Sequence, residues 1–190
     1  KMKSKTEFTR YWFLFFFVYG ISSFVGGLGH ALFYYFGVPG KFFTWITGIL
    51  SIYFIERAMI AVIKEERLYS LLKRIAFSKL LFVFAVFSLV CITQPIVEKP
   101  SIGFLPVAIN TIFGVILSAG ILGYHFSKSI HSDFKYFYYG VLIMVPSAVI
   151  FLAKINPHPW FDKNDLSHVL LTIGIVYFYI GIDKTKDLVR

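Results

Sequence analysis

The sequence predicts an all-α fold, a polytopic transmembrane helix bundle of six spans with both termini in the cytoplasm. Two properties of the whole chain indicate this fold class: 57% of its 190 residues are hydrophobic, and only 15% are charged. Soluble domains carry ~25% charged residues, and a chain of this length cannot bury so much apolar surface in a water-soluble core. We therefore expect residues 1–190 to form a single integral membrane domain, with no room for a second folded unit.

The net charge of the chain, formally +9, raises the alternatives of a nucleic-acid partner and an anionic surface. In a membrane protein, the same excess of Lys and Arg is explained by the positive-inside bias of cytoplasmic loops. No basic stretch alternates with aromatic residues, so we expect membrane lipid as the partner and no nucleic acid. The single cysteine, Cys91, excludes an intrachain disulfide and a thiolate metal cluster.

The first three spans are predicted at about residues 11–36, 42–63 and 80–97. Within the first span, small residues at helical spacing predict a stripe where another helix can approach closely: Gly20, Ser23 and Gly27, with His30 at its end. A glycine-rich turn at residues 37–40 precedes the second span. The charged stretch 64–79 is predicted as a loop, or as a helix lying in the interface, that ends where the third span begins.

The last three spans are predicted at about residues 104–126, 136–153 and 166–182. A turn at residues 98–101, a polar linker at 127–135 and a proline-flanked loop at 156–159 separate them. Each of the six spans contains ~17–25 residues, which is enough to cross ~30 Å of hydrocarbon as a helix. The segments are too long and too apolar to be strands of a membrane barrel.

Lys and Arg are distributed unevenly between the two sides of such a bundle. Fourteen of them fall in the N-terminus, in residues 64–79, in residues 127–135 and in the C-terminal tail. The alternate connections carry four: Lys41, Lys99, Lys154 and Lys163. Because positively charged loops stay in the cytoplasm, this asymmetry predicts cytoplasmic termini and an even number of spans. We expect a multi-pass protein of the bacterial inner (cell) membrane.

Two short stretches at opposite ends of the chain then fall at the same depth. His30 lies near the outer end of the first span, and Asn164, Asp165 and His168 lie at the outer mouth of the sixth. Other polar residues fall in the same layer: Thr44, Thr47, Thr93, Gln94, Asn110, Thr111 and Ser147. Polar groups at this depth need partners inside the bundle, so the sequence predicts a polar pocket in the outer leaflet half.

The residue types in this pocket suggest a metal site. His30 and His168 would hold the ion, because imidazole is a common zinc ligand, and Asn164 or Asp165 would complete or orient the shell in a catalytic role. A place for His168 in the first turn of its helix would favour the neutral imidazole that a metal needs. The alternative is that Asn164 or Asp165 is simply the N-cap of the sixth span.

This layout resembles the core of the alkaline ceramidase and adiponectin-receptor superfamily of membrane hydrolases. That superfamily has Ser-x-x-x-His on an early core span and His-x-x-x-His on the last one, and its three histidines hold a zinc whose water cleaves a lipid amide or ester. His30 and His168 match the first and last histidines. Gly26 stands in place of the serine and Asn164 in place of the remaining histidine. The resemblance implies a zinc-dependent lipid hydrolase with six core spans.

A non-enzymatic function is the alternative. Two histidines at one depth could instead ligate a haem, or the protein could bind lipid or serve as an accessory subunit. A further anomaly is Glu56-Arg57, an ionisable pair predicted in the inner third of the second span, where charged residues are usually functional. Its structural alternative is that Arg57 extends to the inner headgroups while Glu56 pairs with a neighbouring cation.

Overall fold

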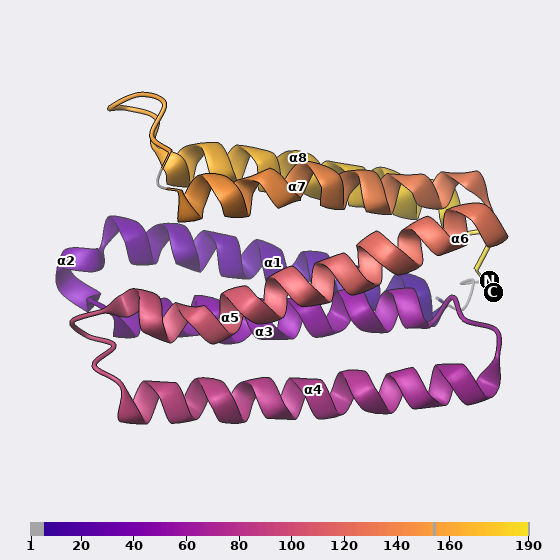
Figure 1. The fold of residues 1–190 in the computed structure, drawn as a ribbon, viewed down its shortest axis with the longest axis horizontal. Coiled ribbons are helices and arrows are strands. Elements are labelled where there is room, and N and C mark those ends of the chain that lie inside the picture. Colours follow the sequence, from indigo (N-terminus) through magenta and orange to yellow (C-terminus); the bar gives the residue numbers. More distant parts are fainter. Residues whose placement is uncertain (1–5, 154, 190) are drawn as a thin grey trace. The chain divides into compact units, whose positions relative to one another are not determined.

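The structure, a computed structural model, describes residues 6–153 and 155–189. Within these residues the chain folds into helices joined by short turns, and no β-strand forms (Figure 1). The predicted all-α class is therefore confirmed. Five cations that contribute to the predicted charge asymmetry lie outside the described residues: Lys1, Lys3, Lys5, Lys154 and Arg190.

Five helical segments in the described part of the chain are long and apolar enough to cross a membrane: Glu7–Ala31, Pro39–Ile60, Glu66–Thr93, Pro100–Ser129 and Lys163–Thr185. They overlap predicted spans one, two, three, four and six. Their length and composition are compatible with a multi-pass membrane protein. The fifth predicted span corresponds to α7 (Lys135–Leu152), an apolar helix of 18 residues that is not among the five.

By its internal contacts the chain divides into two compact units, unit 1 (Lys1–Val115) and unit 2 (Ile116–Arg190). The helical stretch Pro100–Ser129 is continuous across this boundary. Its backbone changes there from α5 (Pro100–Val115) to a π-helix, η1 (Ile116–Leu122), and then to α6 (Gly123–Ser129). The boundary between the units thus coincides with the start of the π-helix. The expectation that the whole chain forms one membrane domain stays a prediction.

The central helix of unit 1 is α3 (Pro39–Ile60). It packs against α1 (Glu7–Ala31), α4 (Glu66–Thr93) and α5, and Figure 1 shows these helices running side by side. In its most apolar stretch 56% of α3 is buried, against 22% of α1 and 17% of α4. One cluster of apolar side chains fills the space around it: Val38, Trp45, Ile49, Leu80, Phe87, Ile96 and Val107.

Small residues bring α1 close to α3, but they are not the predicted ones. Ser22 is buried, and its hydroxyl accepts a 2.8 Å hydrogen bond from Thr47. Gly29 lies so near the Gly40 carbonyl that an added Cβ would approach it to 3.0 Å. The predicted stripe lies on an exposed side of α1, where neither Gly20 nor Gly27 would meet any atom within 4 Å. The contact stripe is displaced by about one residue because the sequence alone does not set the rotation of the helix.

The charged stretch 64–79 is not a separate loop or interfacial helix. Residues 66–79 form the first half of α4, a single helix of 28 residues that begins at Glu66 and ends at Thr93. The physical reason is composition: the stretch consists mostly of Glu, Arg, Leu, Lys and Ala, which are the strongest helix formers. At 1.5 Å per residue α4 is about 42 Å long, which exceeds the ~30 Å of a hydrocarbon core.

Unit 2 contains η1, α6, the short 3₁₀ helix η2 (Ser132–Phe134), α7 and α8 (Lys163–Thr185). In Figure 1, α7 and α8 form an antiparallel pair that lies side by side along its length. Glycines permit the close approach, because an added Cβ at Gly140 would come within 2.8 Å of the Gly174 carbonyl. Nearer the start of α8, the Ser167 hydroxyl donates to the Ser147 carbonyl at 3.1 Å.

Candidate functional site

Two ionisable residues of α3 are buried inside unit 1. Glu56 is 8% exposed and Arg57 is 4% exposed. Charged groups are almost never buried without a partner, because desolvation of the charge is costly. Each of these two is paired with an opposite charge from a neighbouring helix of the same unit. The pairs connect the C-terminal half of α3 to the first turn of α1 and to α4.

Arg57 belongs to a network that joins three helices. Its Nη2 donates to the Glu7 carboxylate at 2.5 Å, and its Nη1 donates to the Tyr53 hydroxyl at 3.0 Å. The Tyr69 hydroxyl donates to the other Glu7 oxygen at 2.6 Å. The guanidinium also lies over the ring of Tyr11, 4.5 Å from its centroid. Arg57 is therefore held by partners inside unit 1. Whether its guanidinium also reaches the depth of the inner headgroups stays a prediction.

Glu56 pairs with Lys79 of α4, whose ammonium donates to Glu56 Oε1. The interpretation that Glu56 pairs with a neighbouring cation is thus confirmed. Gly114 of α5 leaves room for the pair, because an added Cβ there would lie 3.0 Å from Glu56 Oε1 and 2.2 Å from the Ile52 side chain. The two charges neutralise each other in the middle of unit 1.

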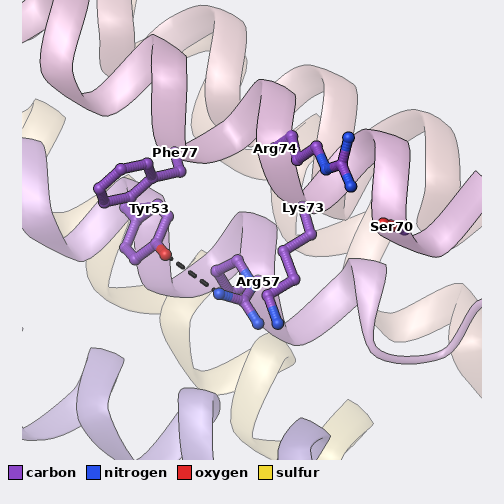
Figure 2. Close-up of a pocket in the computed structure, with 6 residues that line it drawn as sticks. All are labelled: Tyr53, Arg57, Ser70, Lys73, Arg74 and Phe77. Carbon is purple, nitrogen blue, oxygen red and sulfur yellow. Dashed lines mark hydrogen bonds between the residues drawn. The ribbon is translucent and has the colours of Figure 1, made fainter.

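A pocket of about 330 Å³ lies between α3 and α4, beside the Arg57 network. Six residues line it: Tyr53, Arg57, Ser70, Lys73, Arg74 and Phe77 (Figure 2). Arg57 Nε is buried and has no hydrogen-bond partner among the described residues. Lys73 and Arg74 are exposed, and within the described part of the chain neither forms an ion pair.

Helical spacing explains why these side chains meet. Ser70, Lys73, Arg74 and Phe77 follow the i, i+3, i+4, i+7 pattern that places residues on one helix face. Tyr53 and Arg57 are four apart on α3 and share a face in the same way. The short connection 61–65 makes α3 and α4 neighbours. Sequence reasoning missed the pocket because residues 64–79 were assigned to a loop or an interfacial helix and not to one helix continuous with the third span, although their spacing was readable.

The pocket presents hydrogen-bond donors and excess positive charge. In Figure 2 the Arg57 guanidinium and the Lys73 ammonium extend toward the same side of the pocket. Like charges that converge on one space repel each other unless an anion neutralises them. Arg and Lys are the side chains that bind carboxylate and phosphate groups, and a Ser hydroxyl adds a further donor. The arrangement is therefore suited to hold an anion.

The residues of the predicted outer pocket lie in different units. His30 is in the last turn of α1, in unit 1, and His168 is the sixth residue of α8, in unit 2; both are exposed. Whether they share a metal or a haem therefore stays a prediction. In the described residues there is no group of three or more His, Cys, Asp or Glu side chains that could hold a metal ion.

The start of α8 corrects two details of that prediction. The N-cap is Asp162, whose carboxylate accepts the backbone N–H groups of Asn164 and Asp165 at 2.7 and 3.2 Å. These N–H groups, with that of Asp165 contributing most, hold the pKa of Asp162 below its usual value. The helix begins early enough for Asn164 and His168 to share a face. His168 is consequently in the second turn, beyond the strongest effect of the helix dipole.

Asn164 and Asp165, the predicted catalytic residues, both contact this cap. Asp165 completes a capping box by accepting the Asp162 backbone N–H at 3.0 Å. The Asn164 side chain donates to the Asp162 carboxylate at 2.9 Å. The interpretation that one of the two is itself the N-cap is wrong, because a better placed aspartate precedes them.

The chain is an all-α protein whose apolar helices are compatible with a multi-pass membrane protein, and it has a cationic pocket between two of its helices. The chain belongs to a family of unknown function, DUF6962, whose model matches residues 1–187. Neither the curated proteins nor the solved structures contain a significant match to it.

Proposed function

We propose that the chain is a six-span protein of the bacterial inner membrane, with both ends in the cytoplasm, that binds an anionic lipid headgroup in the pocket between α3 and α4. The proposal concerns a binding protein and needs no chemistry at the pocket. It takes up the lipid-binding alternative raised by the sequence and gives it a site on the cytoplasmic side.

The packing inside unit 2 supports six spans. α8 is one of the five helices able to cross a membrane, and α7 packs antiparallel along it, from the Ser147–Ser167 contact near one end to Phe137 against Gly181 near the other. Two apolar helices paired over this length cross a bilayer together. Eighteen residues rise about 27 Å, close to the hydrocarbon thickness.

The position of the pocket in unit 1 supports a place at the inner headgroups. Ser70 precedes the apolar half of α4, which begins at Leu80, by ten residues or about 15 Å. Arg57 is three residues from the end of α3. This end of unit 1 also holds Glu7 at the start of α1, on the side that the excess of Lys and Arg assigns to the cytoplasm.

The observation that carries the proposal is a pair of exposed cations, Lys73 and Arg74, that line the pocket beside Arg57 and have no carboxylate partner among the described residues. Like charges that share one pocket repel each other, so an anion entering the pocket would stabilise the site. Lipid headgroups supply such anions at this depth, and clusters of basic residues at the cytoplasmic surface recognise anionic lipids.

A charge-neutralising variant tests the proposal. Lys73→Gln with Arg74→Gln removes two exposed cations from the pocket and is expected to fold. Lys64→Gln with Arg67→Gln is the matched control, because it removes two exposed cations at the same end of unit 1 that do not line the pocket. We expect native mass spectrometry to show an anionic lipid retained by the parent and by the control and lost from the pocket variant. Equal retention by all three proteins would refute the proposal.

A further inference from the structure

We infer that the pocket between α3 and α4 selects a lipid whose headgroup is a phosphate monoester over lipids that carry a phosphate diester. This inference rests on the proposed function and names the ligand class of the same site. Three features of the pocket support it: its charge balance, its donor groups and its apolar wall.

The charge balance leaves a surplus of two positive charges. Three cationic side chains line the pocket, and Glu7 neutralises Arg57. Lys73 and Arg74 have no carboxylate partner in the described part of the chain. Of the other charges nearby, Glu56 and Lys79 cancel each other. A phosphate monoester carries about −1.5 to −2 charges at neutral pH, which matches this surplus, whereas a diester carries about one.

The donor groups match the number of free oxygens on a monoester. A monoester presents three unesterified oxygens, which act as strong acceptors, and a diester presents two. The pocket offers the Lys73 ammonium, the Arg74 guanidinium and the Ser70 hydroxyl. Each oxygen of a monoester can therefore accept from a separate group. The esterified oxygen of a diester would leave one donor without an acceptor and would add a substituent that the pocket must accommodate.

The apolar wall favours a lipid over free phosphate. Phe77 lines the pocket and is half exposed. It lies on the same face of α4 as the cations, one helical turn nearer to the apolar half of the helix. A glycerol backbone and its acyl chains leaving the headgroup toward the bilayer would cover the ring. Inorganic phosphate would satisfy the cations and leave Phe77 uncovered.

The test compares two lipids on the intact chain. Purified protein in non-ionic detergent is mixed either with phosphatidic acid, a monoester, or with phosphatidylglycerol, a diester. Phosphatidylglycerol is added at twice the mole fraction of phosphatidic acid, so that the negative charge of its micelles is at least as large. Bound lipid is counted by native mass spectrometry at neutral pH. We expect phosphatidic acid to bind roughly tenfold more tightly, the effect of about one charge-assisted hydrogen bond. The preference should disappear in the Lys73→Gln, Arg74→Gln variant and persist in the Lys64→Gln, Arg67→Gln control.

The outcomes separate this inference from the proposed function. Equal affinity for the two lipids, lost in the pocket variant, would overturn the monoester preference and leave the lipid site standing. No saturable binding of either lipid would overturn both. Inorganic phosphate serves as a competitor: if it displaces phosphatidic acid at equal concentration, the site is one for free phosphate, and the lipid part of the inference fails.

Discussion

Arg57 shows how a single buried charge can organise the end of a helix bundle. It is 4% exposed, so its desolvation must be offset by the Glu7 carboxylate, the Tyr53 hydroxyl and the face of the Tyr11 ring. Glu7 is itself oriented by Tyr69. Because each partner comes from α1, α3 or α4, the network fixes the first turn of α1 against α3 and α4.

Removing the Tyr69 hydroxyl is the smallest change that tests this network. Tyr69→Phe removes the 2.6 Å hydrogen bond to Glu7 and keeps the ring. We expect the free energy of unfolding to fall by about 1 kcal/mol. This is less than the ~1.5–3 kcal/mol of a hydrogen bond to a charged group, because Glu7 is partly exposed and screened by solvent. Unfolding in mixed micelles with increasing fractions of sodium dodecyl sulfate measures the change. Tyr34→Phe is the control, because Tyr34 is 92% exposed; equal effects of the two variants would contradict the prediction.

At the scale of elements, the glycines of α7 and α8 decide how closely the pair can pack. An added Cβ at Gly140 would lie 2.8 Å from the Gly174 carbonyl, and one at Gly174 would lie 2.5 Å from Met144 Cγ and 2.8 Å from the Gly140 carbonyl. A methionine side chain can move, but a helix backbone cannot move without separating the pair. The contact is therefore of the small-residue kind that lets membrane helices approach closely.

Substituting Gly140 tests this contact. Gly140→Ala should lower the free energy of unfolding by about 1–3 kcal/mol, the usual cost of overpacking, even though alanine is the better helix former. Gly27→Ala on α1 is the control: no atom lies within 4 Å of its added Cβ, so it should be neutral or stabilising. The fraction of protein that stays monodisperse on size-exclusion chromatography after heating measures both. A Gly140→Ala protein as stable as the control would refute the close contact.

The elements also show where sequence reasoning succeeds and where it stops. Composition and the length of the apolar segments were sufficient to predict the helices, because apolarity over ~20 residues is a property of each segment alone. Apolarity was misleading for residues 64–79. Their charge was taken to exclude them from the third span, although these residue types favour a helix. Which face of a helix contacts its neighbour was still harder to predict. The rotation of α1 that places Ser22 against Thr47 depends on the partner helix.

The candidate site was predictable only in part for the same reason. Glu56-Arg57 stood out because charges inside an apolar span are unusual, and both residues are paired inside unit 1. Their partners Glu7 and Lys79 lie 50 and 23 residues away in sequence, and nothing in the local pattern relates them. The cap of α8 was misplaced by a few residues because Asp162, Asn164 and Asp165 are all good capping residues, and geometry alone separates them.

At the scale of the whole molecule, the metal hypothesis requires residues from both units. His30 belongs to unit 1 and His168 to unit 2, so a shared zinc would tie the two together. Elemental analysis of the purified protein beside a His30→Ala, His168→Ala double variant tests it. The hypothesis predicts about one zinc per chain in the parent, none in the variant and a lower thermal stability after chelation. A parent without metal after zinc is supplied would leave the likeness to ceramidases as one of layout only.

The number of spans decides on which side the two ends of the chain lie. If α7 crosses the bilayer with α8, the chain has six spans and Ser129 lies on the same side as the C-terminal tail. If α7 does not cross, the five helices that qualify by length and composition leave Ser129 and the tail on opposite sides. The side of Ser129 relative to Ser101 is the same in both cases, because only the helix Pro100–Ser129 separates them.

Three single cysteines resolve the topology in a background where Cys91 is replaced by alanine. Ser101→Cys, Ser129→Cys and Leu188→Cys occupy exposed positions at helix ends or beyond them. With six spans and a cytoplasmic N-terminus, a membrane-impermeant maleimide applied to intact cells should label only the first, and all three should react once the membrane is opened. Labelling of Leu188→Cys from outside would indicate five spans. Labelling of Ser129→Cys but not Ser101→Cys would reverse the orientation and place the cationic pocket on the outer face, against the charge asymmetry that predicts it inside.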